Sequence, residues 1–267
     1  MIKPVFSFAI FTLIIVAIGL NLGILQNTSG VYGAAMIRAE AMRYNLGMSD
    51  PNNAALFIFG TFIALVLLFC NKYLRVIIIM LLTPIALFVF AKTGSKTFFA
   101  AWFVFCLLYF MRKYIINRFT IKIIKIIPII LLFSLLFIIF NIEKFRFIDF
   151  LLTGRVKTYH QLVSKAALID YIIGNPFLER GDETIIIDSF YIRYFFQGGI
   201  IFFFIIQYLY YHAMNYYYIN DKKVEILVLI VYLLYGITTT IGVYVFTNII
   251  FWILLSVNTR YTKEIRK

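Results

Sequence analysis

Long apolar runs divide almost the whole sequence into segments of membrane-crossing length. Six of them lie near residues 5–25, 54–71, 73–92, 96–111, 126–142 and 187–211. A helix needs about 20 apolar residues to cross the hydrocarbon core of a bilayer, so each run predicts one membrane span. Hydrophobic residues make up 63% of the chain, well above the roughly 45–50% of soluble domains. The sequence therefore predicts an integral membrane protein, with residues 1–267 forming a single membrane domain.

The last apolar run, 224–258, is too long for one ordinary span. Its middle holds three consecutive threonines between Gly236 and Gly242, so we predict two short helices that meet at a tight turn. The predicted fold is thus an all-α polytopic membrane protein with about eight transmembrane helices. Its largest outer loop is 143–187, between the fifth and sixth spans, and carries most of the charged side chains that are placed outside the membrane.

The distribution of charge predicts the orientation. If the chain crosses the membrane at every span, one side collects 14 cations and three acids, for a net charge of +11. The other side collects ten cations and nine acids, for a net charge of +1. Because Lys and Arg are enriched in cytoplasmic loops, both termini are predicted to be cytoplasmic, in the cytoplasmic membrane. The total charge of +13 then reflects topology and predicts no nucleic-acid partner.

Two arginines, Arg38 and Arg43, precede the second span in the outer loop 26–53. Asp50, Asn52 or Asn53 can cap the helix that follows, with Pro51 holding Asp50 extended. One interpretation is a simple turn with solvated arginines. The other places both arginines around an anionic ligand at the start of that helix, where free N–H groups favour phosphate.

The loop 143–187 begins its central part with Gly154-Arg155. Apolar residues at near-helical spacing over 156–173 predict one amphipathic helix on the membrane surface, ended by Gly174-Asn175-Pro176. Arg155 and Lys157 would lie in its first turn, where the helix dipole disfavours cations. That placement indicates an anionic partner, although solvated surface cations are the commoner explanation.

A polar stripe runs into the sixth span, where Ser189, Arg193 and Gln197 follow one another at intervals of four residues. An arginine at this depth either snorkels to the surface or lines a site. The glycine pair at 198–199 is expected to weaken the helix or to allow another helix to approach closely.

Several apparent motifs are rejected. The segment Gly94-Ser95-Lys96-Thr97 lacks the order of a phosphate-binding loop and begins a span on the outer face. His160 and His212 are predicted on opposite sides of the membrane, so no histidine-based metal site is expected. Both cysteines, Cys70 and Cys106, lie in apolar runs and are interpreted as small hydrophobic residues.

Four segments, taken in order, resemble the O-antigen polymerase and ligase superfamily of bacterial surface polysaccharides. They are Arg43-x3-Gly47-x3-Pro51-Asn52, Gly94-Ser95-Lys96-Thr97, Thr153-Gly154-Arg155, and Asp188-Ser189 followed by Gly199. The similarity covers about residues 38–205. Ligases of this family have a histidine where this chain has Asp188, which favours a polymerase. Members also have more spans and a longer N-terminus, so a shortened or N-terminally truncated chain is expected.

The resemblance implies a glycosyltransferase that polymerises polyprenyl-diphosphate-linked oligosaccharide repeat units at the outer face of the membrane. Its donor carries its own leaving group, so no cofactor and no metal are expected. Implied partners are the lipid-linked glycan, the bilayer, and a flippase and chain-length regulator of the same pathway. The alternatives are a ligase that transfers glycan to a lipid or protein acceptor, and a flippase or non-catalytic component of polysaccharide export.

Roles for individual residues follow from that implied reaction. Arginine holds a diphosphate in a fork and stays charged, which assigns Arg155, Arg43, Arg38 and Arg193 to the leaving group. Asp188 would orient or deprotonate the acceptor hydroxyl, with His160 as the alternative base. Arg180 and Asp182, later in the same loop, would bind sugar.

Overall fold

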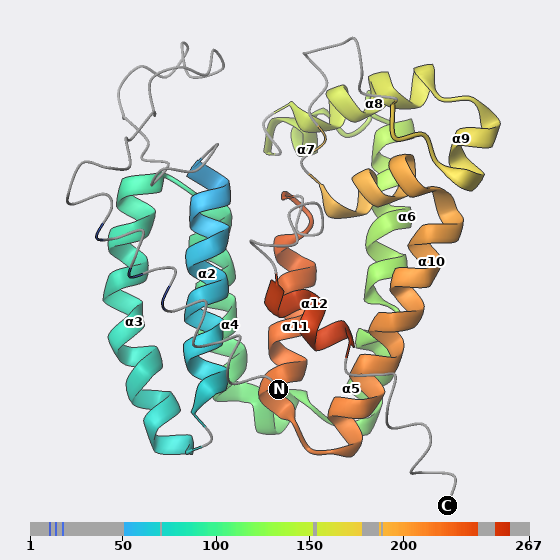
Figure 1. Cartoon of the computed structure of the whole chain (residues 1–267). Helices are drawn as coiled ribbons and strands as arrows, with labels where there is room; N and C mark the ends of the chain where they lie inside the picture. Colours follow the sequence, from blue (N-terminus) through green and yellow to red (C-terminus); the bar gives the residue numbers. More distant parts are fainter. Residues whose placement is uncertain are drawn as a thin grey trace, which may run out of the picture. The chain divides into compact units, whose positions relative to one another are not determined.

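A computed structural model gives the fold of the chain (Figure 1). It describes residues 11, 14, 18, 51–69, 71–151, 154–177, 187, 189–239 and 249–256. Within these residues every regular element is a helix, which confirms the predicted all-α class. Three helices are long and apolar enough to cross a membrane, namely α3 (Lys72–Thr93), α4 (Lys96–Ile115) and α10 (Phe190–Ile219). The bent pair of α5 (Arg118–Ile124) and α6 (Ile127–Phe140) makes a fourth if it is one span.

The described helices do not support the predicted count of eight spans. Of the first predicted span, 5–25, the structure describes only three residues, all helical. The apolar helices α2 (Pro51–Leu68), α11 (Lys223–Tyr235) and α12 (Ile249–Ser256) coincide with predicted spans but are shorter than α3, α4 and α10. By length and composition the described residues therefore provide three spans, or up to four, and the count of eight stays a prediction.

The described helices fall into two compact units. The first comprises residues 1–112 and 245–253, and the second comprises 113–244 and 254–267. In the first unit, aromatic rings fill the core, with the Phe62 ring 5.2 Å from that of Trp102 and 6.1 Å from that of Phe98. The Trp102 indole donates a hydrogen bond to the Thr83 hydroxyl at 3.3 Å, which satisfies its polar atom inside the packed helices.

The connection between α3 and α4 is a tight turn at Gly94 and Ser95. Gly94 ends α3 in the left-handed conformation, with φ 63°, and its N–H donates to the Phe90 carbonyl. The Ser95 hydroxyl then accepts a hydrogen bond from the Phe98 N–H at 3.4 Å and caps α4. A helix stop followed at once by a helix start accounts for the glycine and the serine of this segment.

In the second unit, α5 and α6 meet at a bend of 40°. A bend leaves backbone carbonyls without their helical partners, and inside a membrane those groups need another donor. Two side chains of α10 provide it. Gln207 donates to the Lys125 carbonyl at 2.6 Å, and the Tyr210 hydroxyl donates to the Ile124 carbonyl at 3.4 Å. The ammonium of Lys125 in turn donates to the Asn215 side-chain oxygen.

The segment after α6 forms a layer of short helices: α7 (Arg146–Leu151), α8 (Arg155–Lys165) and α9 (Leu168–Ile173). The prediction of one amphipathic helix over 156–173 is wrong, because the backbone is extended at Ala166 and Ala167. The Asp170 carboxylate accepts the Ala167 N–H at 2.8 Å and thereby starts a new helix. The predicted stop is confirmed, since Gly174 ends α9.

The longest helix, α10, is broken at Gly199, where φ is 70° and ψ is 179°. Its first part, 190–198, runs across the end of the unit, and its second part runs alongside α6 (Figure 1). The second part, 200–219, is about 30 Å long at 1.5 Å per residue and by itself matches the thickness of a bilayer core. Arg193 was predicted inside a span. It lies in the first part of α10, before the break at Gly199.

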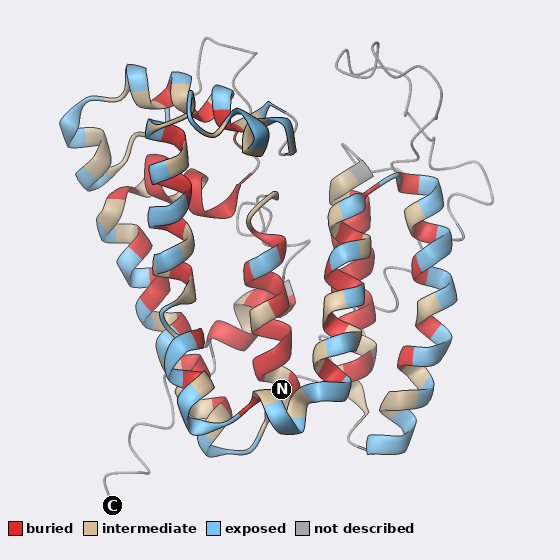
Figure 2. Cartoon of the chain, turned by 180° about the vertical axis from the view of Figure 1, so that it is seen from behind, coloured by how far each residue is buried: buried red, intermediate tan, exposed pale blue. Residues whose placement is uncertain are grey.

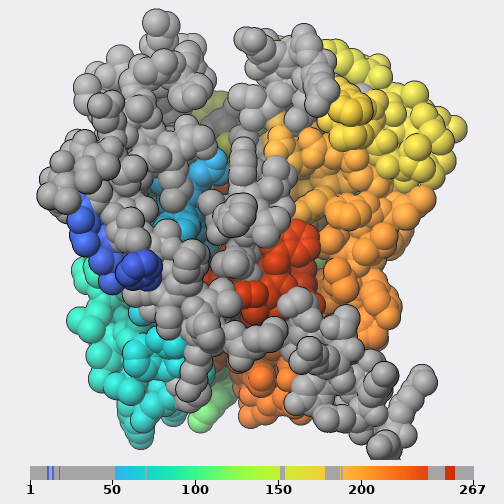
Figure 3. All heavy atoms as spheres, in the orientation of Figure 1, coloured from blue at the N-terminus to red at the C-terminus, as the bar shows by residue number. Residues whose placement is uncertain are grey.

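The break in α10 is matched by the turn that ends α9. The Asn175 N–H donates to the Phe196 carbonyl at 2.7 Å, and the Tyr171 ring packs 5.7 Å from that of Phe196. In the space-filling view the yellow atoms of α9 rest on the orange atoms of α10 (Figure 3). The prediction that the glycine pair permits a close approach is therefore confirmed, with Gly199 against the turn at Gly174.

The last apolar run behaves as predicted up to its turn. Helix α11 ends at Tyr235, and residues 236–238 form a turn. Its side chains are buried along nearly the whole helix (Figure 2). The next described residues, 249–256, form α12, and the Tyr217 hydroxyl of α10 donates to its Leu254 carbonyl at 3.0 Å.

Candidate functional site

Three of the predicted site residues, Arg155, His160 and Arg193, lie in the part of the chain that the structure describes. The others fall outside it, namely Arg38, Arg43, Arg180, Asp182 and Asp188. The candidate site is therefore built from α8, from the start of α10, and from the turn that follows α11.

Arg155 is the first residue of α8 and is half-buried. Gly154 precedes it in the left-handed conformation, with φ 79°, which turns the chain sharply out of the preceding segment. The guanidinium then reaches across the unit, where Nη1 donates a hydrogen bond to the Thr238 carbonyl at 3.2 Å. This contact joins residues 83 positions apart and fixes the first turn of α8 against the turn after α11.

The first turn of α8 already has an anion beside it. The Asp149 carboxylate of α7 accepts the Lys157 N–H at 3.0 Å, and the Asp149 carbonyl accepts the Gly154 N–H at 2.8 Å. A carboxylate at a helix N-terminus is favoured by the helix dipole. Asp149 therefore balances part of the charge of Arg155 and Lys157 within the chain, which the sequence interpretation did not include.

The start of α10 is held by the same turn. The Ser189 N–H donates to the Tyr159 hydroxyl of α8 at 3.0 Å, in a fully buried position. The Phe190 N–H donates to the Gly236 carbonyl at 2.9 Å and to the Thr239 carbonyl at 3.1 Å. Backbone carbonyls of the turn thus satisfy the N-terminus of α10.

We call this meeting point of three elements the junction. It consists of Arg155, Tyr159, Ser189, Phe190 and the turn 236–239. Sequence reasoning identified Arg155 and Ser189 but missed Tyr159 and the turn, which was interpreted only as a connection. The available signal was the polar run at 238–240 inside a long apolar stretch, because such residues in a membrane segment usually have polar partners.

His160 does not face the junction. Its Nδ1 lies 3.0 Å from the Ile139 carbonyl of α6. A carbonyl only accepts, so the ring nitrogen donates in this contact. Five residues separate His160 from Arg155, which turns the two side chains about 140° apart around α8. The structure therefore does not bring the alternative base to the arginine.

Arg193 and Gln197 lie one and two turns beyond Ser189 in the first part of α10, and both are half-buried. Their helical spacing confirms the predicted stripe as far as the break at Gly199. Beside the first part of α10, burial raises the pKa of the Tyr171 phenol of α9, and the neighbouring Asp170 carboxylate raises it further. The protonated Tyr171 hydroxyl donates a hydrogen bond to the Val163 carbonyl at 3.2 Å.

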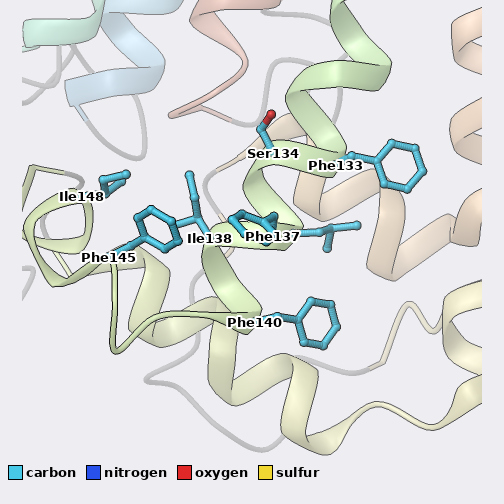
Figure 4. Close-up of a pocket in the computed structure, with 8 residues that line it drawn as sticks. Phe133, Ser134, Phe137, Ile138, Phe140, Phe145 and Ile148 are labelled. Atoms are coloured by element: carbon cyan, nitrogen blue, oxygen red, sulfur yellow. The ribbon is translucent and has the colours of Figure 1, made fainter.

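An apolar hollow of about 850 Å³ lies along α6 and the segment that leads into α7. Its wall includes Phe133, Phe137 and Phe140 of α6, with Phe145 and Ile148 from the next segment and Ser134 as a hydroxyl. Figure 4 shows Phe145 reaching back toward Ile138. The hollow is open and almost entirely hydrocarbon-lined, which suits an apolar chain and not a sugar.

No family model, curated protein or solved structure matches this chain. Within the described residues, no group of three or more His, Cys, Asp or Glu side chains is placed to hold a metal ion.

Proposed function

We propose that the chain polymerises polyprenyl-diphosphate-linked oligosaccharide repeat units into a bacterial surface polysaccharide. The proposal rests on two features of the second unit: an arginine whose guanidinium is held by a hydrogen bond to the Thr238 carbonyl, and an apolar hollow. Arg155 lies at the start of α8, and the hollow lies along α6. A lipid diphosphate needs both a cationic contact for its phosphates and an apolar surface for its chain.

In the proposed step, the hydroxyl oxygen of the acceptor unit attacks the anomeric carbon of the donor sugar. A new glycosidic C–O bond forms, and the bond to the polyprenyl diphosphate breaks, with its electron pair leaving on the diphosphate. The acceptor's proton passes to a base, which we assign to Asp188, because His160 is turned toward Ile139 of α6. Arg155 stabilises the charge that develops on the leaving phosphate, together with Arg38, Arg43 and Arg193.

The proposal includes the finer topology. Eight spans would place both termini in the cytoplasm and the segments 26–53 and 143–187 outside. Cysteines introduced at Thr158 in α8 and at Lys223 at the start of α11 test it, in a background without the native cysteines. The Thr158→Cys variant is expected to react with a membrane-impermeant maleimide in intact cells, and Lys223→Cys only after permeabilisation. Reaction of both from the same side would contradict the topology.

Substitution of Arg155 tests the function most directly. Arg155→Ala is expected to lower polymerisation of extracted lipid-linked repeat units at least 100-fold, by loss of about 3–4 kcal/mol of transition-state stabilisation. Arg155→Lys keeps the charge but loses the fork, so only partial rescue is expected. The readouts are the ladder of chain lengths and the release of polyprenyl diphosphate, with purified protein at matched amounts.

The matched control is Lys157→Ala in the same turn of α8. Its side chain is exposed, and its backbone N–H contact to Asp149 survives the substitution. The control is expected to stay within about twofold of wild type, as is usual for surface positions. Equal losses in both variants would assign the effect to general charge. Normal ladders from Arg155→Ala would remove Arg155 from the mechanism.

The hollow is tested by filling it. Ile138→Trp adds a large ring to its wall and is expected to raise the KM for long-chain polyprenyl donors at least tenfold. Donors with a short, water-soluble chain do not need the hollow, so their KM is expected to change less than about twofold. An equal rise for both donors would show that the hollow does not hold the hydrocarbon chain.

A further inference from the structure

The surface around α5 combines cations with exposed apolar side chains. Arg118 and Lys122 are exposed and lie four residues apart, so they form one stripe along the helix. Phe119 and Ile123 form the neighbouring stripe, and 73% and 45% of their respective surfaces are accessible. Ile121, on a third face, is buried in the unit and anchors the helix.

The end of α4 continues this surface within the second unit. Lys113 is exposed, and Tyr114 beside it is 81% accessible. We call Lys113, Tyr114, Arg118, Phe119, Lys122 and Ile123 the α5 surface. Asn117 caps the N-terminus of α5. Its side chain accepts the Phe119 N–H at 3.0 Å and the Thr120 N–H at 2.9 Å.

No acidic side chain balances these cations along the chain. From Pro51 to Ile142 the sequence contains no Asp and no Glu. Within the described residues, none of Lys113, Arg118 and Lys122 forms an ion pair. Like charges four residues apart on a helix repel each other, so the stripe works against the stability of the isolated helix. An external anion would remove that repulsion.

We propose that the α5 surface binds the phosphate headgroups of anionic phospholipid. The exposed Phe119 and Ile123 make a lipid the fitting partner, because they would enter the acyl boundary while Arg118 and Lys122 meet the phosphates. A soluble phosphate would use the cations and leave the apolar stripe in water. In the proposed orientation this surface faces the cytoplasmic leaflet, but the proposal does not depend on the polymerase activity.

A lipid titration tests the proposal. Fluorescent phosphatidylglycerol and phosphatidylcholine with identical chains are titrated into the purified full chain in neutral detergent, and binding is followed by anisotropy. Wild type is expected to prefer phosphatidylglycerol at least about 25-fold. A juxtamembrane cation contributes about 1 kcal/mol, or about fivefold. The variant Arg118→Gln/Lys122→Gln is therefore expected to weaken phosphatidylglycerol binding about 25-fold and to leave phosphatidylcholine unchanged.

The α10–α11 connection provides a control with the same loss of charge. Lys222 and Lys223 lie between Asp221 and Glu225, and Lys223 pairs with Asp221 at 3.4 Å, so this segment has no net charge. Lys222→Gln/Lys223→Gln is expected to change phosphatidylglycerol binding less than threefold. Equal weakening in both double variants, or an unchanged preference in Arg118→Gln/Lys122→Gln, would overturn the proposal.

Two further arms separate the possible sources of the anion and guard against misfolding. Inorganic phosphate at ten times the lipid concentration is expected not to displace the lipid; full displacement would assign the surface to a soluble anion and overturn the proposal. Phe119→Ser keeps the cations and is expected to weaken both lipids equally, whereas an unchanged affinity would contradict apolar insertion. If Arg118→Gln/Lys122→Gln is not monodisperse, Lys113→Gln/Lys122→Gln carries the same prediction.

Discussion

The α3–α4 connection in the first unit and the α9–α10 connection in the second both turn at glycines with positive φ. At Gly94 the turn is local, because the glycine bonds to the helix it ends and Ser95 caps the next. At Gly174 and Gly199 the turn is reciprocal. Each glycine lies against the backbone of the other segment, and the Gly174 N–H also donates to the Asp170 carbonyl of the helix that it ends.

The difference shows two uses of the same residue. A local turn needs a glycine for its dihedral angle alone, so it tolerates change in the surroundings. A reciprocal contact needs it for both the dihedral angle and the space, since a Cβ on Gly199 would overlap the Ile172 carbonyl oxygen and lie 2.6 Å from the Gly174 nitrogen. The second unit therefore concentrates its sensitivity to substitution where α9 contacts the broken helix α10.

The largest effect is expected from Gly199→Ala. Its φ of 70° and ψ of 179° fall in a region that essentially only glycine adopts, and the new Cβ meets backbone that cannot rotate away. We expect a loss of at least about 3 kcal/mol in the free energy of unfolding, or no folded protein. Denaturant unfolding in detergent, followed by helical circular dichroism, measures it.

Gly154→Ala is the matched control for that experiment. Gly154 has a similar φ of 79°, but no heavy atom lies within 4 Å of the Cβ position. Only the left-handed backbone is penalised, by about 1–2 kcal/mol. If both variants lose the same stability, the close approach of α9 to α10 contributes nothing, and the comparison between local and reciprocal turns fails.

A smaller effect is expected from Tyr159→Phe at the junction. The hydroxyl is the acceptor for the buried Ser189 N–H, and its removal leaves that donor unsatisfied. Such a loss destabilises by about 1–3 kcal/mol. Thermal unfolding measures stability, and hydrogen exchange at the start of α10 is expected to speed up while the first unit is unchanged. Unaltered exchange at Ser189 would show that the bond does not hold α10.

The smallest effect is expected from Ser95→Ala in the first unit. Its hydroxyl caps α4 through one long hydrogen bond to the Phe98 N–H, so the variant is expected to lose about 1 kcal/mol or less. Ser95→Asn retains a capping oxygen and is expected to recover most of the loss. A penalty larger than that of Tyr159→Phe would reverse the ranking of the two connections.

Much of the helix pattern was predictable from the sequence. The runs 73–92 and 96–111 correspond closely to α3 and α4, and the glycine stop at Gly174 falls where α9 ends. The break between α8 and α9 was missed because Ala166 and Ala167 favour helix. Their extended backbone is compensated by the Asp170 carboxylate and by the Tyr171 contact to Val163. Apolar spacing alone does not distinguish one amphipathic helix from two.

The candidate site was predictable only in its residue types. Arginine in the outer loop indicated Arg155, but the partner at Thr238 lies 83 residues away, and no local pattern connects them. His160 was predicted as the alternative base, whereas helix geometry directs its side chain to Ile139 of α6. Asp149 was counted as loop charge, although it caps the first turn of α8.

The sequence by itself determined the helical class and the apolar segments, because these depend on composition and on spacing within about four residues. The tertiary structure alone decided which carbonyls the side chains of α10 satisfy and how Arg155 is held. The physical reason is that broken helices must satisfy their backbone with donors from other segments, as Gln207 does for Lys125. Those partners are chosen by packing between segments remote in sequence.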